Sequence, residues 1–236
     1  MEPSARDAAL AVVVTRPVAM IAHTYYDEDP RVRREAEALV ASGRPVDVFA
    51  LRRPKDAHRD ELHGVRIHRL GVRRHQGAPL VVYAAEYLDF FVRAAFAVTA
   101  KHRRRRFALV QVHTVPDFLV FAAWPLKKSG VPVVLDLHEV MPEFFRTRFA
   151  RSAHPAVVAL VELQERLSVG AADALITVND DVAARLSRRG VPADKITVVR
   201  NSPSARLFDP GSQPARRFME DGVLRLVYAG ALTPNY

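Results

Sequence analysis

One kind of junction occurs three times along this chain and restricts the folds it can adopt. Each time, a stretch of helical character ends at a glycine, a short loop with a proline follows, and a run of apolar residues comes next. Glycine favours the end of a helix and proline cannot continue one, so each junction marks a change from helix to strand. The junctions lie at residues 41–49, 128–135 and 189–199. Their repetition predicts an α/β fold with a doubly wound parallel sheet.

The spacing of apolar residues gives the order of the remaining elements. Short apolar runs predict strands, and apolar residues three or four apart predict helices. The predicted strands are residues 18–22, 46–51, 65–70, 109–113, 133–138, 174–178, 196–199 and 224–230. The predicted helices are residues 31–41, 80–100, 117–128, 156–169 and a last one between Asn179 and Gly190. Asp29 is the expected N-cap of the first helix, with Pro30 in its first turn.

Composition excludes several kinds of site. None of the 236 residues is cysteine, which excludes disulfides, thiolate metal ligands and cysteine nucleophiles. No apolar run reaches the length that spans a membrane, and acidic residues flank the run at 8–14, which argues against a signal peptide. The formal net charge of +9 leaves open an attraction to nucleic acid, to an anionic membrane or to phosphorylated substrates.

Several short elements near the end of the chain keep a distinctive order and spacing. They are Glu162 or Glu165, Ala172-Asp173, Ile176, Val178, Leu186, Gly190-Val191, Lys195-Ile196, Asn201, Phe208 and Pro210. In this order they resemble the end of the N-terminal domain of glycosyltransferases with the GT-B architecture, family 4 in particular. Two more stretches, D-P-R-V-R-R-E-A from Asp29 and D-L-H-E-V-M-P-E from Asp136, resemble motifs of a bacterial polysaccharide-type subgroup. The resemblance extends over most of residues 17–236.

The resemblance implies a division of the chain into four parts. Residues 1–16 form a disordered leader, and residues 17–204 form the Rossmann-like N-terminal domain on the acceptor side. Residues 205–222 link this domain to residues 223–236, the first strand of a C-terminal donor-binding domain that is truncated there. In the family, further donor-binding elements follow that strand. We therefore expect the chain alone to be inactive or nearly so.

Candidate site residues should follow the predicted strands. In an open α/β sheet, ligands bind beyond the carboxyl ends of the strands. His113 ends one strand, and a neutral imidazole offers one donor and one acceptor to sugar hydroxyls. The resemblance implies that His113 lies beside the donor sugar, which makes it the candidate catalytic residue. The alternative is a strand-end histidine that is bonded to the backbone.

Further substrate-binding candidates follow the first strand. His23 and Thr24 begin a loop that leads to a helix N-terminus, a natural site for anions. Many family 4 members have a glycine-rich loop there, but this chain has no glycine from residue 18 to residue 42. Two interpretations stay open for Arg31, with Arg34: they face an acceptor or a phosphate, or they are solvated while Asp29 caps the helix.

The D-x-H-E stretch places more candidates at a central strand end. His138 and Glu139 are predicted to line the cleft and to bind substrate, unless Asp136 and His138 form a structural hydrogen-bonded pair. The D-x-H spacing also suggests a metal, but two residues are too few for a site. Because family 4 enzymes generally need no metal, none is predicted. Asn201, from the stretch near the chain end that resembles the family, completes the substrate-binding candidates, and Gly230, in a G-x-L turn, is the candidate for binding the donor.

Two interpretations stay open for the helix at 80–100 and the basic run at 101–106. An aromatic amphipathic helix with a basic end suits an anionic membrane surface. Alternatively, the helix faces the core and its basic end is solvated and suits the helix dipole. The expected partners are a nucleotide sugar, a glycan or lipid-linked acceptor and an anionic membrane surface. No nucleic acid is expected, because the chain carries no nucleic-acid motif.

The resemblance implies a retaining hexosyltransferase that moves a sugar from a nucleotide-diphosphate sugar to a hydroxyl acceptor in glycan or exopolysaccharide biosynthesis. The donor is a substrate, and no cofactor is expected. The expected location is cytoplasmic, with peripheral attachment at the inner face of the membrane. Two alternatives stay open: a GT-B-like nucleotide-sugar 2-epimerase, and a non-catalytic basic module that binds membrane or nucleic acid. A dinucleotide-binding domain is disfavoured, because no G-x-G-x-x-G follows a strand.

Overall fold

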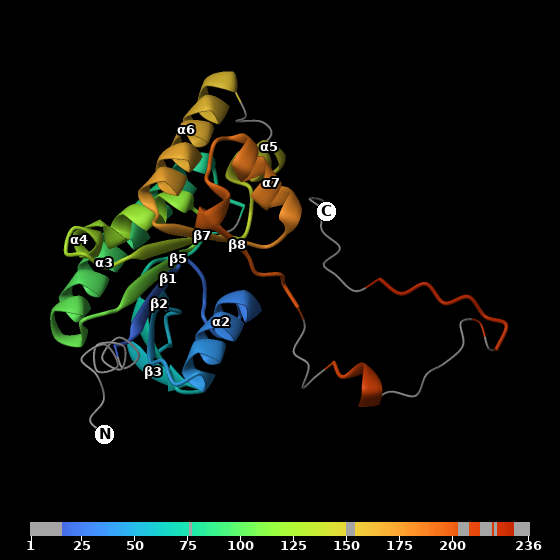
Figure 1. Ribbon diagram of the computed structural model, residues 1–236, viewed down its shortest axis with the longest axis horizontal. Coiled ribbons are helices and arrows are strands. Elements are labelled where there is room, and N and C mark those ends of the chain that lie inside the picture. The colour runs from blue at the N-terminus through green and yellow to red at the C-terminus, as the bar shows by residue number, and fades with distance from the viewer. Residues whose placement is uncertain are drawn as a thin grey trace. The chain divides into compact units, whose positions relative to one another are not determined.

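The computed structural model describes residues 16–75, 77–149, 154–202, 208–212, 219 and 221–228. The chain divides into two compact units, Met1–Val199 and Arg200–Tyr236. The described residues of the first unit form one eight-stranded sheet (Figure 1). Its strands are β1 Val18–Ala22, β2 Val46–Leu51, β3 Arg59–Leu62, β4 Val65–Leu70, β5 Leu109–His113, β6 Val133–Leu137, β7 Ala174–Thr177 and β8 Ile196–Val198.

The strand order is β3-β4-β2-β1-β5-β6-β7-β8. Each neighbouring pair is parallel except β3 and β4, which are antiparallel. From β1 the chain builds the sheet in one direction through β2 and β4, and from β5 it builds in the other direction. The boundary between β1 and β5 is therefore the topological switch point, where open α/β sheets bind ligands. This order confirms the predicted doubly wound parallel sheet.

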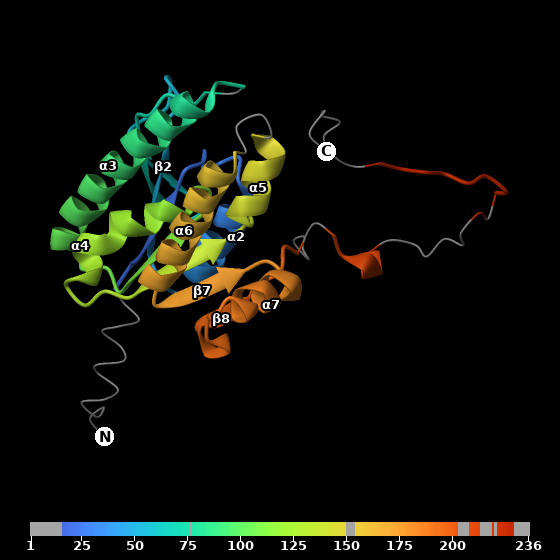
Figure 2. The same ribbon diagram turned by 90° about the horizontal axis from the view of Figure 1, so that it is seen from above.

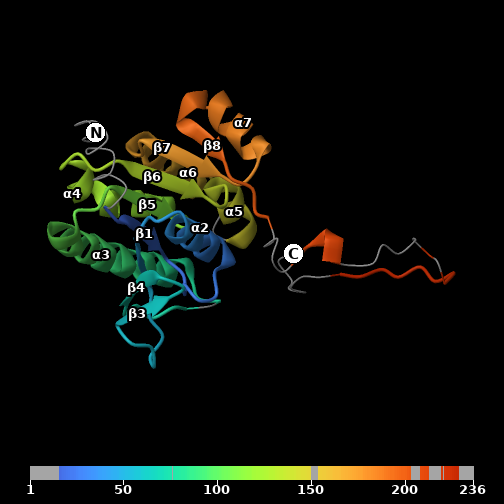
Figure 3. The same ribbon diagram turned by 60° about the horizontal axis from the view of Figure 1, so that its bottom comes forward.

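Helices cover both faces of the sheet. The helical elements are α2 Pro30–Ala41, α3 Leu80–Arg105, η1 Asp117–Ala123, α4 Trp124–Lys127, α5 Met141–Arg148, α6 Pro155–Ala171, α7 Asp180–Arg188, η3 Ala193–Lys195 and η4 Pro210–Ser212. Figure 2 shows α3, α4 and α6 side by side on one face, and Figure 3 shows α2 on the other. None of the described helices combines the length and the apolar character needed to cross a bilayer.

Two hydrophobic cores follow from the alternation of side chains along the strands. Successive residues of a strand point to opposite faces of the sheet. In β1, Ala19 and Ile21 join the core under α3, α4 and α6, whereas Val18, Met20 and Ala22 join the core under α2. This alternation also decides on which face each polar side chain at a strand end lies.

The local signals in the sequence act as expected. The carboxylate of Asp29 accepts a hydrogen bond from the backbone N–H of Arg31 at 3.1 Å, and Pro30 occupies the first turn of α2. The junction glycines Gly43, Gly130 and Gly190 all have φ between 82° and 90°, a left-handed conformation that favours glycine. The three predicted helix-to-strand junctions are therefore confirmed.

Two elements longer than three residues were not predicted. The edge strand β3 has the polar sequence R-D-E-L and pairs with β4 through a tight turn at His63 and Gly64, both with positive φ. The short helix α5 begins at Met141, shortly after β6 ends at Leu137. The predicted helix at 117–128 is instead a 3-10 segment, η1, followed by the single turn of α4, and α3 continues five residues beyond its predicted end at residue 100.

In the second unit, residues 224–228 of the predicted strand have no strand conformation and are exposed. A strand needs a neighbour to pair its backbone groups, and the described residues offer none. Residues 229–230 of this strand and residues 1–15 of the predicted leader lie outside the described residues, as does much of the predicted linker at 205–222. The assignment of a second domain stays a prediction.

The buried carboxyl group of Asp117, at the start of η1, is expected to make the free energy of unfolding decrease as the pH rises. Its side chain is fully buried, and neither carboxyl oxygen has a hydrogen-bond partner among the described residues. Burial, followed by the negative charge of Glu165, raises the pKa of Asp117 well above its usual value. The folded state thus holds a proton that the unfolded state releases near pH 4, so stability is lost between that pH and the raised pKa.

Asp117→Asn removes this titration and should raise the free energy of unfolding by about 1–3 kcal/mol at pH 7. Urea unfolding of both proteins across pH 4.5–8 measures the difference, which should grow with pH. Asp194→Asn is the control, because Asp194 is exposed. A difference that stays constant with pH would contradict the buried neutral acid.

Candidate functional site

Polar side chains from two neighbouring strands gather on the α2 face of the sheet, beside the switch point. They are Gln111 and His113 of β5, Asp136 of β6 and His138, which directly follows β6. His113 stands in register with Asp136 of β6 on one side and with Ala22 of β1 on the other. All four are buried. The carboxyl ends of β5 and β6 thus carry a dry, polar group of side chains.

Three of these side chains converge on one point and form the histidine–aspartate cluster of His113, Asp136 and His138. The Nδ1 atom of His113 lies 2.9 Å from Oδ2 of Asp136, and Nε2 of His138 lies 3.3 Å from the same oxygen. The two ring nitrogens are 3.1 Å apart, and the rings stack at an interplanar angle of 13°. Gln111 donates to Asp136 at 3.4 Å and also to Glu35 of α2.

The cluster divides its charges unequally. Burial alone would raise the pKa of Asp136 and lower that of His113, but the hydrogen bond and the opposite charges between them reverse both directions. Burial lowers the pKa of His138 to about 4. The positive charges of His113 and Arg31 also lower it, and together these effects outweigh the negative charge of Asp136, which raises it. Burial, followed by the charge of Asp136, raises the pKa of Glu35 to about 7. The raised pKa of His113 and the lowered pKa of Asp136 favour an ion pair between these two side chains, beside a His138 that is neutral at pH 7.

One nitrogen of each histidine in the cluster is left without a partner. Nε2 of His113 and Nδ1 of His138 are buried and have no hydrogen-bond partner among the described residues. The backbone N–H of His138 is held by the hydroxyl of Thr114 at 3.0 Å, which fixes the position of this residue. Buried polar atoms are nearly always paired in native proteins. Two unpaired nitrogens on neighbouring rings therefore indicate a place for a polar ligand.

The same cluster could hold a divalent metal. Its three donor atoms all lie within 4.8 Å of one another and come from two histidines and one carboxylate, which are zinc ligands. The measured separations of 2.9, 3.1 and 3.3 Å are close to the spacing of about 3.3 Å between ligands that lie about 2.0 Å from a tetrahedral zinc ion. The sequence suggested only two ligands, and the fold adds His113 as the third.

His23 does not join this cluster. Because it follows Ala22 in the alternation, its side chain lies on the α3 face of the sheet. Its Nε2 atom is 3.1 Å from Glu86 of α3, and its ring makes edge-to-face contacts with Tyr87 and Phe90 at 4.8 and 5.0 Å. The structure thus separates two histidines that the sequence had assigned to one site.

Arg31 lies near the cluster but is already paired. Its guanidinium group contacts both carboxylate oxygens of Asp29 at 3.2 Å, and its charge lowers the pKa of His138. Arg34 donates to the backbone carbonyl of Pro30 at 3.0 Å. The capping role of Asp29 is therefore confirmed, and Arg31 remains within electrostatic reach of the site.

The other candidates lie apart from the cluster. Thr24 is half-buried, and its carbonyl accepts the N–H of Leu51 at 2.9 Å. Glu139 follows His138 but is exposed, with no side-chain hydrogen bond to a described residue. Asn201 is exposed and belongs to the second unit, and Gly230 lies outside the described residues.

Three residues of the site were not predicted as site residues: Glu35, Gln111 and Asp136. Gln111 and Asp136 lie two positions before His113 and His138, so strand alternation puts each on the same face as its histidine. A polar residue two positions before a strand-end histidine, within an otherwise apolar strand, was the available signal. Glu35 had no such signal, because only packing of α2 on the sheet brings it to Gln111.

Comparison with known proteins agrees with this geometry. The profile of the glycosyl transferase 4-like domain matches residues 29–202. Sucrose-phosphate synthase from Thermosynechococcus elongatus superposes with a TM-score of 0.60 and 18% identity, over 82% of this chain and 50% of that chain. The glycotransferase of kitacinnamycin superposes with a TM-score of 0.52 and 14% identity, over 86% of this chain and 55% of that chain.

A third solved structure has a different activity in its name. UDP-GlcNAc 2-epimerase from Neisseria meningitidis, bound to UDP-GlcNAc, superposes with a TM-score of 0.50 and 14% identity, over 77% of this chain and 45% of that chain. No sequence among the curated proteins is similar enough to count as a relative. The chain thus spans about half the length of each of these three solved structures.

Proposed function

From the premise that this chain belongs to the glycosyl transferase 4-like family, we propose that it is the acceptor-side domain of a retaining glycosyltransferase. The enzyme transfers a hexose from a nucleotide-diphosphate sugar to a hydroxyl acceptor. The observation that carries this proposal is the pair of unpaired ring nitrogens, Nε2 of His113 and Nδ1 of His138, at the switch point of the sheet. Sugar hydroxyls both donate and accept hydrogen bonds, so they suit such a pair.

The cluster assigns a separate task to each side chain. Asp136 fixes the ring of His113 through Nδ1 at 2.9 Å, so Nε2 has one orientation toward the sugar. Nε2 of His113 can donate a hydrogen bond to a group on which negative charge develops, such as the donor phosphate as it leaves. His138 is neutral and offers Nδ1 to a hydroxyl group. Residues beyond this chain complete the donor site in this proposal, since the chain spans about half of its structural neighbours.

A lipid-linked glycan at an anionic membrane surface is the acceptor that we propose. The supporting feature is a row of exposed apolar side chains on α3, namely Val81, Leu88, Val92 and Phe96, which precedes the basic residues at its end. Residues at this spacing lie along one side of a helix. Attachment at the inner face of the membrane, and a role in exopolysaccharide assembly, belong to this proposal.

Product analysis tests the proposed reaction. The protein that contains this domain is incubated with nucleotide-diphosphate sugars and a hydroxyl acceptor, and the products are identified by mass spectrometry and NMR. A new glycoside with the anomeric configuration of the donor is expected. A free sugar epimerised at C2 would establish the epimerase instead. If the activity disappears after dialysis against EDTA and returns when zinc is added, the cluster binds a metal ion instead of a sugar hydroxyl.

A further inference from the structure

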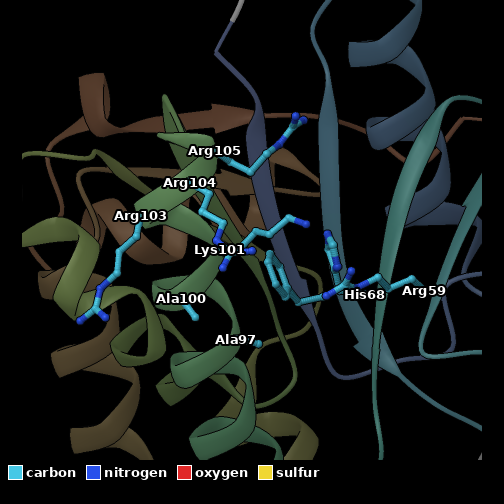
Figure 4. Close-up of a pocket in the computed structure, with 9 residues that line it drawn as sticks. Arg59, His68, Ala97, Ala100, Lys101, Arg103, Arg104 and Arg105 are labelled. Carbon is cyan, nitrogen blue, oxygen red and sulfur yellow. The ribbon is translucent and has the colours of Figure 1, made fainter.

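A pocket lies on the face of the sheet opposite the cluster, at the C-terminal end of α3 (Figure 4). Its volume is about 630 Å³, which is within the range of small-molecule sites. Side chains from three strands and one helix line it: Phe49, Arg59, His68, Ala97, Ala100, Lys101, Arg103, Arg104 and Arg105. We call it the basic pocket.

The basic pocket is separate from the histidine–aspartate cluster. Phe49 belongs to the core on the α3 face, whereas the cluster lies on the α2 face. Along α3, Phe90 contacts His23 near the carboxyl ends of the strands. Lys101 lies 11 residues farther along α3, so the helical rise places it about 16 Å closer to the amino ends of the strands. A ligand in the basic pocket would not contact the cluster.

Positive charge in the basic pocket exceeds what the described residues neutralise. Asp47 is the acid at its base, fully buried and already bound to His68 at 2.7 Å and Arg105 at 3.1 Å. Four further cations have no hydrogen bond or ion pair with any described residue: Arg59, Lys101, Arg103 and Arg104. Figure 4 shows that these side chains come from α3 on one side and from β3 on the other.

Burial and the neighbouring cations affect the pKa of Lys101. Burial, and the charges of Arg59, Arg105 and Arg66 against that of Asp47, lower the pKa of Lys101. An anion between α3 and β3 would relieve this repulsion. Phosphate suits the geometry, because arginine binds its oxygens in pairs and lysine adds a point charge.

The inner wall of the basic pocket is apolar. Ala97 and Ala100 line it on the helix, and the ring of Phe49 stacks on His68 with centroids 4.9 Å apart. A ligand with phosphate groups at one end and a flat or apolar part at the other would contact both kinds of surface.

We propose that the basic pocket is a second binding site, which takes a compound carrying one or two phosphate groups. The phosphate lies among Arg59, Lys101 and Arg104, and Asp47 holds Arg105 and His68 beneath it. The phosphate belongs either to a free small molecule or to a lipid headgroup. The site shares no residue with the cluster, so it does not depend on the proposed sugar transfer, but a lipid headgroup there would involve the same basic end of α3 as the proposed membrane attachment.

Calorimetric titration of the full chain with inorganic pyrophosphate tests the proposal. The double variant Lys101→Gln/Arg104→Gln removes two unpaired cations from the pocket and should weaken binding at least about tenfold. Lys55→Gln/Arg188→Gln is the matched control, because it removes one lysine and one arginine that are exposed and lie outside the pocket. This control should bind as the wild type does, and circular dichroism melting confirms that both variants fold.

A second arm separates the two sources of phosphate. Flotation with vesicles of phosphatidylcholine, alone or with phosphatidylglycerol, measures lipid binding of the same three proteins. Pyrophosphate binding that depends on Lys101 and Arg104 supports a free phosphate compound. Vesicle binding that depends on these residues, without pyrophosphate binding, supports a lipid headgroup. The proposal is overturned if neither probe binds, or if the pocket variant and the control weaken binding equally.

Discussion

Replacing Asp136 with alanine is expected to lower the free energy of unfolding by about 3–5 kcal/mol, because it leaves a buried partner charge uncompensated. Asp136 is fully buried. Its Oδ2 atom lies 2.9 Å from Nδ1 of His113 and 3.3 Å from Nε2 of His138, and it accepts a hydrogen bond from Gln111 at 3.4 Å. Without the carboxylate, His113 must lose its proton or remain charged in a dry site. Either outcome lowers the stability by more than the loss of one partner of a surface ion pair does.

Urea unfolding at pH 7, followed by circular dichroism, measures this loss. Asp60→Ala is the matched control, because Asp60 is an exposed carboxylate that pairs with Arg69 at 2.8 Å. Surface pairs of this kind contribute about 0–1 kcal/mol. Equal losses in the two variants would show that the cluster does not depend on a buried ion pair.

His113→Asn is expected to lower kcat/KM for glycosyl transfer by about 10²–10³-fold, the usual effect of removing one hydrogen-bond donor that acts on the transition state. An asparagine amide can reach Asp136 in place of Nδ1 but puts no group where Nε2 was. The loss should therefore appear in turnover, and the unfolding midpoint should also fall, because the buried Asp136 keeps only a neutral partner. His113→Gln tests the complement, since its longer side chain restores a donor near Nε2 and loses the contact with Asp136.

The control for this substitution is His154→Asn. His154 is the exposed N-cap of α6, where its Nδ1 atom accepts the N–H of Ala156 at 3.3 Å. Asparagine is a good N-cap, so folding and activity should both persist. Full activity of His113→Asn in the protein that contains this domain would remove His113 from the proposed sugar site.

The sequence alone determined those features that depend on near neighbours along the chain. The glycines at residues 43, 130 and 190 ended helices because their left-handed φ is set locally, and Asp29 capped α2 two residues from its partner. Apolar runs marked seven of the eight strands, whereas β3 was missed because an exposed edge strand buries no apolar stripe. Strand-end positions therefore identified His113 and His138, but not what surrounds them.

Tertiary structure decided which polar residues meet. His113 and His138 become neighbours because β5 and β6 pair in register, and Glu35 reaches Gln111 only because α2 packs across the sheet. Alternation along β1 sends His23 to the opposite face, although a strand end alone made it look equivalent to His113. The end of α3 and the edge strand β3 likewise form the basic pocket from distant parts of the chain. Local sequence sets conformation residue by residue, while a site depends on contacts between segments, which only the order and register of the strands fix.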